Sequence, residues 1–184
     1  MKLLYHSLQN GIRLVHYRTN GMISHCGLLI NTGSRDEKSD EHGIVHLIEH
    51  MLFKGTGKRR AYHILSSLDD VGGELNAYTT KEETAVHASV LNQNFEKAVD
   101  IISDITFYST FPEKEISKEK EVIIEEINSY LDNPAELIFD DFEEQVFYGY
   151  PIGRNILGPS ASVRSFTRES LKKFVSQKYK PYNP

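Results

Sequence analysis

The sequence His46-Leu47-Ile48-Glu49-His50 lies in the middle of an apolar segment, 44–53, whose periodicity predicts a helix. On a helix His46 and His50 are one turn apart, so both imidazole rings project from the same face. Two imidazoles placed in this way can bind one Zn²⁺ ion, which proteins usually hold in a tetrahedral site. Glu49 lies on the same side, within reach of a water molecule beside such an ion. The pattern predicts a helix that carries two metal ligands and a carboxylate able to accept a proton.

The patterns on both sides of this helix predict an α+β fold, in which a mainly antiparallel sheet is packed by helices. The dipeptide Asn10-Gly11 is a strong signal for a hairpin with a two-residue turn between two β-like runs. Strands are expected early and helices late, which favours this class over a parallel, doubly wound sheet. The expected strands are 3–8, 12–17, 24–31, 74–80 and 84–91, the expected helices are 44–53, 61–71, 94–109, 113–131, 135–147 and 167–179, and 148–159 is expected to be a loop.

Composition bounds the class of protein and its partners. The chain of 184 residues fits one domain, and its 39% hydrophobic and 26% charged residues are typical of a soluble globular protein. A formal net charge of -5 provides no electrostatic footprint for nucleic acid or an anionic membrane. The single cysteine, Cys26, excludes an intramolecular disulfide and permits a reducing compartment. With no signal-like start and no membrane-spanning apolar run, we expect a cytoplasmic protein without nucleic-acid or membrane partners.

A third metal ligand is expected from the helix at 113–131. Its isoleucines and its leucine form a core-facing stripe, and at about 100° per residue Glu119 and Glu126 fall within that arc. Glu121 and Glu125 point to the opposite, solvated face. A carboxylate on a core face is costly unless it is paired, protonated or bound to metal. Glu119 and Glu126 are two turns apart on one line, which suits one as a metal ligand and the other as its partner.

The order of these motifs resembles the pitrilysin/insulinase type of zinc metallopeptidase, and in particular processing-peptidase-like bacterial proteins. The H-x-x-E-H order, the reverse of the commoner H-E-x-x-H, is the inverzincin signature. The resemblance extends from the Asn10-Gly11 hairpin to Tyr182-Asn183 and implies the first half-domain of a mitochondrial-processing-peptidase-like metallohydrolase fold. The matching motifs are His46-Leu47-Ile48-Glu49-His50, Phe53-Lys54-Gly55-Thr56, Gly72-Gly73-Glu74-Leu75-Asn76-Ala77 and Glu119…Glu125-Glu126.

The resemblance also implies a complete metal site. In the family the third zinc ligand is a glutamate roughly 75 residues past the second histidine, which here is Glu126, the residue that helix geometry already favours. The family's auxiliary glutamate lies seven positions earlier and corresponds to Glu119. One Zn²⁺ ion per chain would therefore be held by His46, His50 and Glu126, with Glu119 behind them.

The implied activity is that of a zinc-dependent endopeptidase acting on extended peptides or small unfolded proteins. Glu49 would take the proton from the attacking water and deliver it to the leaving amine. The strand with Asn76 and Ala77 would be an edge to which an extended substrate adds.

Full members of the family carry two similar halves that close around the substrate. The chain 1–184 is therefore expected to be one N-terminal peptidase domain that carries the zinc site and stops before its last strand. A missing C-terminal half, a second subunit or another copy in a homodimer would complete the chamber.

Two other functions stay open from the sequence. A peptide-binding or assembly subunit of the same fold would do no chemistry, although such relatives typically lose the H-x-x-E-H residues, and an isolated fragment could also be inactive. S-ribosylhomocysteine lyase uses the same motif with a cysteine ligand, but Cys26 precedes the motif. The other candidate histidines have structural interpretations: His42 lies ahead of the helix, and His63 and His87 lie within an expected helix and strand.

Overall fold

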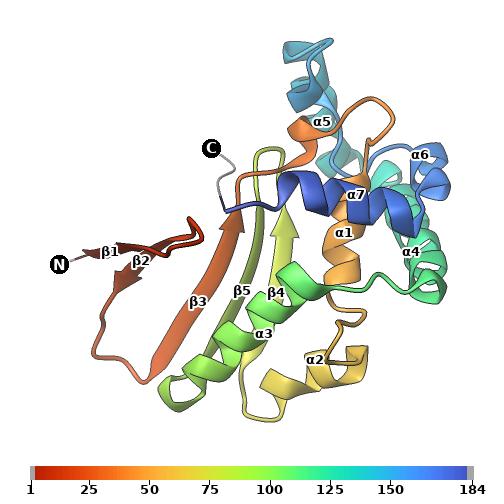
Figure 1. Cartoon of the computed structure of the whole chain (residues 1–184). Coiled ribbons are helices and arrows are strands. Elements are labelled where there is room, and N and C mark those ends of the chain that lie inside the picture. The colour runs from red at the N-terminus through yellow and green to blue at the C-terminus, as the bar shows by residue number, and fades with distance from the viewer. Residues whose placement is uncertain (1–2, 182–184) are drawn as a thin grey trace.

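The structure is a computed structural model that describes residues 3–181 (Figure 1). Five strands and seven α-helices follow one another in the described part of the chain. Their bounds are β1 (Leu3–Ser7), β2 (Arg13–Tyr17), β3 (Ile23–Ile30), α1 (Ile44–Leu52), α2 (Ala61–Asp69), β4 (Glu74–Thr79), β5 (Thr84–Leu91), α3 (Phe95–Tyr108), α4 (Glu113–Leu131), α5 (Pro134–Val146), α6 (Ser160–Ser165) and α7 (Arg168–Lys178). The predicted α+β class, with antiparallel strands packed by helices, is confirmed.

Among the described residues, the central sheet has three antiparallel strands in the order β3-β5-β4. Strand order places β4 at one edge, and a short turn joins β4 to β5, in which the Thr80 amide donates to the Glu83 carbonyl at 2.8 Å. Helix α3 lies across one face of this sheet (Figure 1). On that face Val86, Ala88 and Val90 are buried in the core. The opposite face is largely exposed among the described residues, as the alternation of exposed and covered positions along β3 and β4 shows.

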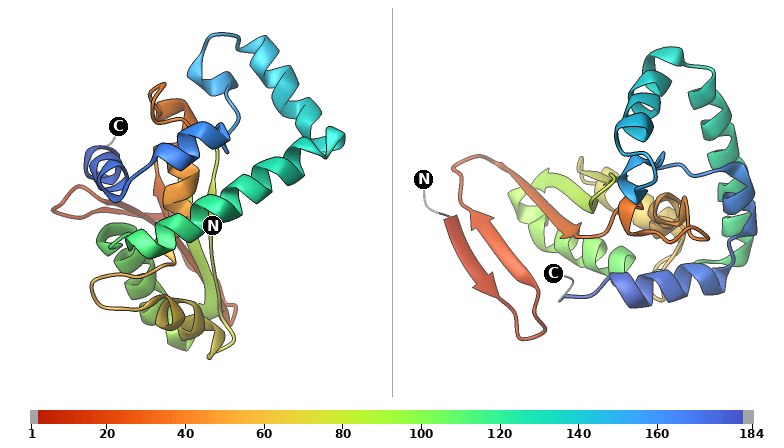
Figure 2. Two further views of the ribbon diagram at one scale, coloured as in Figure 1. Left: turned by 90° about the vertical axis from the view of Figure 1, so that its right-hand side faces the viewer. Right: turned by 90° about the horizontal axis from the view of Figure 1, so that it is seen from above.

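Helix α1 is the most deeply buried helix, and the other helices surround it in the view from above (Figure 2). It packs against α4 on one side and β4 on the other. Its start is fixed by the buried Glu37 carboxylate, which accepts hydrogen bonds from the amides of Gly43 at 3.0 Å and Val45 at 2.9 Å. Gly43 has φ 94, and a Cβ there would lie 2.6 Å from the Leu157 carbonyl oxygen, so only glycine fits. Hydrogen bonds and close packing therefore fix the start of the helix with the H-x-x-E-H residues.

Strands β1 and β2 form a hairpin that lies apart from the three-stranded sheet (Figure 2). The hairpin is confirmed, but the two-residue turn predicted from Asn10-Gly11 is wrong. The Leu8 amide donates to the Ile12 carbonyl at 2.8 Å, which leaves a three-residue loop in which Gly11 adopts φ 92. A slot of about 750 Å³ separates the hairpin from β3. Within residues 3–181, neither the hairpin nor the outer edge of β3 has a strand partner on the slot side.

All of the predicted strands and helices are present, with ends that shift by at most two residues. The prediction missed the short helix α6. It also missed the 3₁₀ turn Pro151–Gly153, which lies inside the expected loop 148–159. Tyr182 and Asn183, which carry the end of the family resemblance, lie outside the described residues. Over the described range, no helix is long and apolar enough to cross a membrane.

Candidate metal centre

His46 and His50 project from α1 toward Glu126 on α4. The two imidazole centroids are 4.7 Å apart, with an interplanar angle of 66°. The Glu126 carboxylate lies against both rings, with Oε1 3.8 Å from His46 Nε2 and Oε2 3.7 Å from His50 Nε2. One ligand atom from each residue lies within 4.8 Å of the others. A tetrahedral zinc site with bonds of about 2.0–2.1 Å has ligand atoms about 3.3–3.4 Å apart, so small adjustments would bring these three around one ion.

The donor set and its surroundings fit zinc. Two imidazole nitrogens and one carboxylate oxygen are the protein ligands found in many catalytic zinc sites, where the fourth position is left for water or substrate. The His46 side chain is only 10% exposed, whereas that of Glu126 is 44% exposed. Burial, assisted by the neighbouring His50, lowers the pKa of His46 to about 3. This imidazole therefore stays neutral and keeps a lone pair for a metal ion at ordinary pH.

The buried His46 makes the stability of the metal-free protein depend on pH. An unfolded chain binds a proton at this imidazole below about pH 6.5, whereas the folded chain does so only near pH 3. The contribution of His46 to the free energy of unfolding therefore has its full value above pH 6.5, where the ring is neutral in both states, and it is lost as the pH falls toward 3. Because one pKa unit corresponds to about 1.4 kcal/mol, we expect a loss of about 4–5 kcal/mol over this range.

Urea unfolding of the metal-free protein between pH 7 and about pH 4 measures the part of this loss that falls above pH 4, which is about 3 kcal/mol. The His46→Gln variant lacks the titrating ring, so it should lose less stability than the wild type on acidification. If the free energies of unfolding of the wild type and the His46→Gln variant differ by the same amount at every pH, the expectation is wrong.

Glu119 lies behind His50 rather than beside the three converging atoms. Its side chain is 9% exposed, and its Oε2 is 3.1 Å from His50 Nδ1, the ring nitrogen that faces away from Glu126. Its Oε1 is 2.7 Å from the ammonium of Lys54, which follows α1 in the chain. A carboxylate on the far nitrogen of a metal-binding histidine orients the ring and selects its tautomer. The structure thus places Glu119 in contact with a candidate ligand but not at the candidate metal position.

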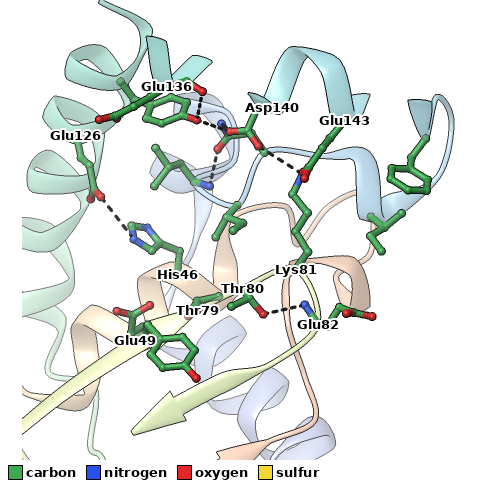
Figure 3. A pocket seen from close by; sticks show the side chains of 17 residues that line it. His46, Glu49, Thr79, Thr80, Lys81, Glu82, Glu126, Glu136, Asp140 and Glu143 are labelled. Carbon is green, nitrogen blue, oxygen red and sulfur yellow. Dashed lines mark hydrogen bonds and ion pairs between the residues drawn. The ribbon is translucent and has the colours of Figure 1, made fainter. Parts of the chain in front are cut away.

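Glu49 faces the same pocket as His46 and Glu126 (Figure 3). Burial raises the pKa of its carboxyl above the usual range, while the side chain and backbone of Thr79 act in the opposite direction. The three-residue cluster that could hold a metal within residues 3–181 does not include Glu49. Its carboxylate is therefore free to accept a proton beside the cluster.

The pocket beside the cluster has a volume of about 810 Å³ and is strongly acidic. Besides Glu49 and Glu126, its lining includes four further carboxylates, from Glu82, Glu136, Asp140 and Glu143. The ammonium of Lys81 reaches into it, 3.4 Å from Asp140 Oδ1 and paired with Glu143 (Figure 3). Sequence reasoning missed these residues, because acidic positions on α5 and in a loop have the same pattern as a solvated surface.

Asn76 and Ala77 lie on the edge strand β4, as the family resemblance implies. The Ala77 amide donates to the Asn76 side-chain oxygen at 2.9 Å and so points away from β5. Neither residue lines the pocket, which the same strand reaches through Tyr78 and Thr79. The two residues therefore occupy the edge that leads to the pocket.

The remaining candidate histidines lie outside the cluster. His42 precedes α1, and its Nε2 is 2.7 Å from the Asn155 carbonyl oxygen. His63 is exposed on α2, and His87 lies on β5 with its ring centroid 6.0 Å from that of Tyr78. The structure brings none of the three to the cluster of His46, His50 and Glu126.

Two comparisons of the sequence with known proteins both match this chain to peptidases. The family model for Insulinase (Peptidase family M16) matches residues 14–160, which include the cluster, Glu49 and Glu119. An uncharacterized zinc protease of Rickettsia felis is 42% identical over 177 residues, which are 96% of this chain and 43% of that protein. Mitochondrial-processing peptidase subunit beta of Dictyostelium discoideum is 38% identical over 175 residues, which are 94% of this chain and 37% of that protein.

The fold matches solved structures closely. The crystal structure of a protease from Helicobacter pylori superimposes with a TM-score of 0.93 at 25% identity, over 99% of this chain and 44% of that one. The chain spans less than half the length of each of these three proteins.

Proposed function

This chain belongs to the insulinase family of peptidases, peptidase family M16, and we propose that it is the metal-binding part of a zinc-dependent endopeptidase. The observation that carries the proposal is the convergence of His46, His50 and Glu126, of which His46 and Glu126 line an open pocket together with Glu49. The relative from Rickettsia felis is named a zinc protease, which supports zinc as the metal.

In this proposal each residue at the centre has one task. His46, His50 and Glu126 would hold the zinc ion, and Glu119 would orient the His50 ring. Bound zinc supplies Lewis acidity toward the peptide carbonyl and makes water easier to deprotonate. Glu49 would accept the proton of the attacking water and return it to the leaving amine. Burial raises the pKa of Glu49 above the usual carboxyl range, which suits a group that must both take up and release a proton.

The edge of β4 would bind the substrate as an additional strand. An extended peptide forms main-chain hydrogen bonds with a free sheet edge and places alternate side chains in pockets. Ala77 offers an amide at this edge once the Asn76 side chain releases it. A peptide along β4 would continue past Thr79 into the pocket that contains Glu49.

The acidic pocket would favour a basic side chain near the bond that is cut. Its carboxylates outnumber the single ammonium of Lys81, so the pocket attracts cations. A substrate guanidinium could pair with Asp140 or Glu136 as arginine pairs with carboxylates elsewhere. An acidic side chain at the same place would be repelled.

A second half would complete the chamber in this proposal. The chain spans less than half the length of its relatives, and one of them is named a subunit. The completing part would be a C-terminal half, a second subunit or another copy of the chain. The last strand expected for the domain would fit the slot between the hairpin and β3, where it could pair with two strand edges that have no strand partner within residues 3–181.

Metal analysis and a cleavage assay with fluorescence-quenched peptides test the proposed function. The assay uses this chain and any longer form of the protein that contains it, with and without a chelator, on two peptides that differ only in one arginine or glutamate. We expect about one zinc per chain, chelator-sensitive cleavage of the longer form, and faster cleavage of the arginine peptide. Stoichiometric zinc without any cleavage of either peptide would favour a binding or assembly subunit, and protein free of zinc after supply of the metal would refute the proposal.

A further inference from the structure

Lys54 follows the helix that carries the histidines and turns back toward α4. Helix α1 ends at Leu52, and the Lys54 amide donates to the Met51 carbonyl at 3.2 Å, which continues the helical turn. Its ammonium is 2.7 Å from Glu119 Oε1, and the side chain is 27% exposed. One short segment therefore supplies both the metal-facing imidazoles and a cation that reaches the opposite helix.

Glu119 needs this cation because its own surroundings are apolar. It lies on α4 between the buried Ile116 and Ile123, and only 9% of its side chain is exposed. An ionised carboxylate in such a place is costly unless an opposite charge and hydrogen bonds compensate it. Within the described residues Lys54 is the only lysine or arginine that forms an ion pair with Glu119.

The other oxygen of Glu119 acts on His50. A carboxylate accepts hydrogen bonds and donates none, and a neutral imidazole carries one ring proton. The 3.1 Å contact between Glu119 Oε2 and His50 Nδ1 therefore places that proton on Nδ1. This leaves Nε2 with its lone pair, and Nε2 is the atom that lies 3.7 Å from Glu126 Oε2.

The two histidines depend on different forces for their orientation. His46 is held by burial, with its side chain 10% exposed and its Nδ1 without a hydrogen-bond partner in the described structure. The His50 side chain is 22% exposed, so packing restrains it less. His50 thus relies on Glu119, and Glu119 relies on Lys54.

We propose that Lys54 is a positioning residue for the metal centre, which acts through Glu119 to hold His50 with its Nε2 toward the metal position. This inference rests on the proposed function as far as the metal is concerned. Without the ammonium, Oε1 of Glu119 loses its partner, the carboxylate turns toward solvent, and Oε2 leaves His50 Nδ1. His50 then samples both tautomers and both ring orientations, which weakens metal binding.

Three variants test the proposal in a matched set. Lys54→Met removes the charge, Lys54→Arg keeps it, and Lys118→Met removes a different lysine of comparable geometry. Lys118 forms an exposed ion pair of 2.7 Å with Glu115 on the same helix, one turn before Glu119. Zinc affinity is measured by competition with a chromogenic chelator. The tautomer of His50 is measured in the metal-free protein by long-range ¹⁵N–¹H NMR correlation.

We expect Lys54→Met to weaken zinc binding by about 10–100-fold and to reduce the population of His50 with its proton on Nδ1. Lys54→Arg should stay within about threefold of the wild type, because the guanidinium can pair with the same carboxylate, and Lys118→Met should match the wild type. Unchanged zinc affinity and tautomer in Lys54→Met would overturn the proposal, and so would equal losses in Lys54→Met and Lys118→Met.

The NMR measurement keeps the proposal falsifiable if a variant does not fold or if zinc does not bind. A wild-type protein whose His50 carries its proton on Nε2 in the metal-free state would refute the orienting role directly. A wild-type protein that binds no zinc but has His50 protonated on Nδ1, with loss of that preference in Lys54→Met, would refute the proposed function and leave the contact chain from Lys54 to His50 supported.

Discussion

Replacing Glu49 with glutamine is expected to lower peptide hydrolysis by about 10²–10⁴-fold and to leave zinc bound. Glutamine has nearly the same size as glutamate and can keep contact with Thr79, but its amide cannot accept a proton at neutral pH. Glu49 faces the pocket and is not one of the three residues whose ligand atoms converge. The kcat in the peptide cleavage assay and the zinc content of the variant check this prediction together.

A second pocket carboxylate provides the matched control. Glu82 lines the same pocket, is exposed and pairs with Arg35 on the surface, so Glu82→Gln also removes one negative charge from the pocket. Its hydrolysis should stay within a few-fold of the wild type. Retained turnover in Glu49→Gln would exclude Glu49 as the general base, and loss of zinc in that variant would indicate that Glu49 holds the metal or the helix instead.

The helix-borne part of the centre was predictable because helical geometry is local. The spacing of His46 and His50 determines that their rings share a face, and neither burial nor packing changes this relation. The same periodicity placed Glu119 on the core side of α4, where the structure has it buried. Glu126 is less buried than its place near that stripe predicts, because it lies where α4 borders the open pocket.

The ion pairs around the metal centre were not predictable from the sequence, because they form between segments that are distant along the chain. Lys81 lies in the turn after β4, and Asp140 and Glu143 lie on α5, so their pairing requires the whole path of the chain between them. Each of these residues in isolation fits a solvated surface. The pair of Lys54 and Glu119 is similar, since the exposed-looking lysine after α1 gains its partner only when α4 packs against that helix.

Removing one metal ligand should weaken zinc binding more than replacing Lys54, which contacts Glu119 and not the metal position. We expect His50→Ala and Glu126→Ala each to weaken zinc binding by more than about 100-fold, beyond the range expected for Lys54→Met. A catalytic zinc site needs three protein ligands, and each variant leaves only two. Zinc content after dialysis and chelator competition measure the loss, and thermal unfolding of the metal-free variants shows that the fold persists.

Control variants at two other positions distinguish the loss of a metal ligand from the loss of any carboxylate or imidazole. Glu125→Ala removes a neighbouring, exposed carboxylate from α4, and His63→Ala removes an exposed imidazole from α2. Both should bind zinc as the wild type does, because neither side chain belongs to the cluster. Stoichiometric zinc in Glu126→Ala would refute Glu126 as the third ligand, and the centre would then require a donor from outside the cluster. A graded series, in which the ligand variants lose more zinc than Lys54→Met and the controls lose none, is the result that this geometry requires.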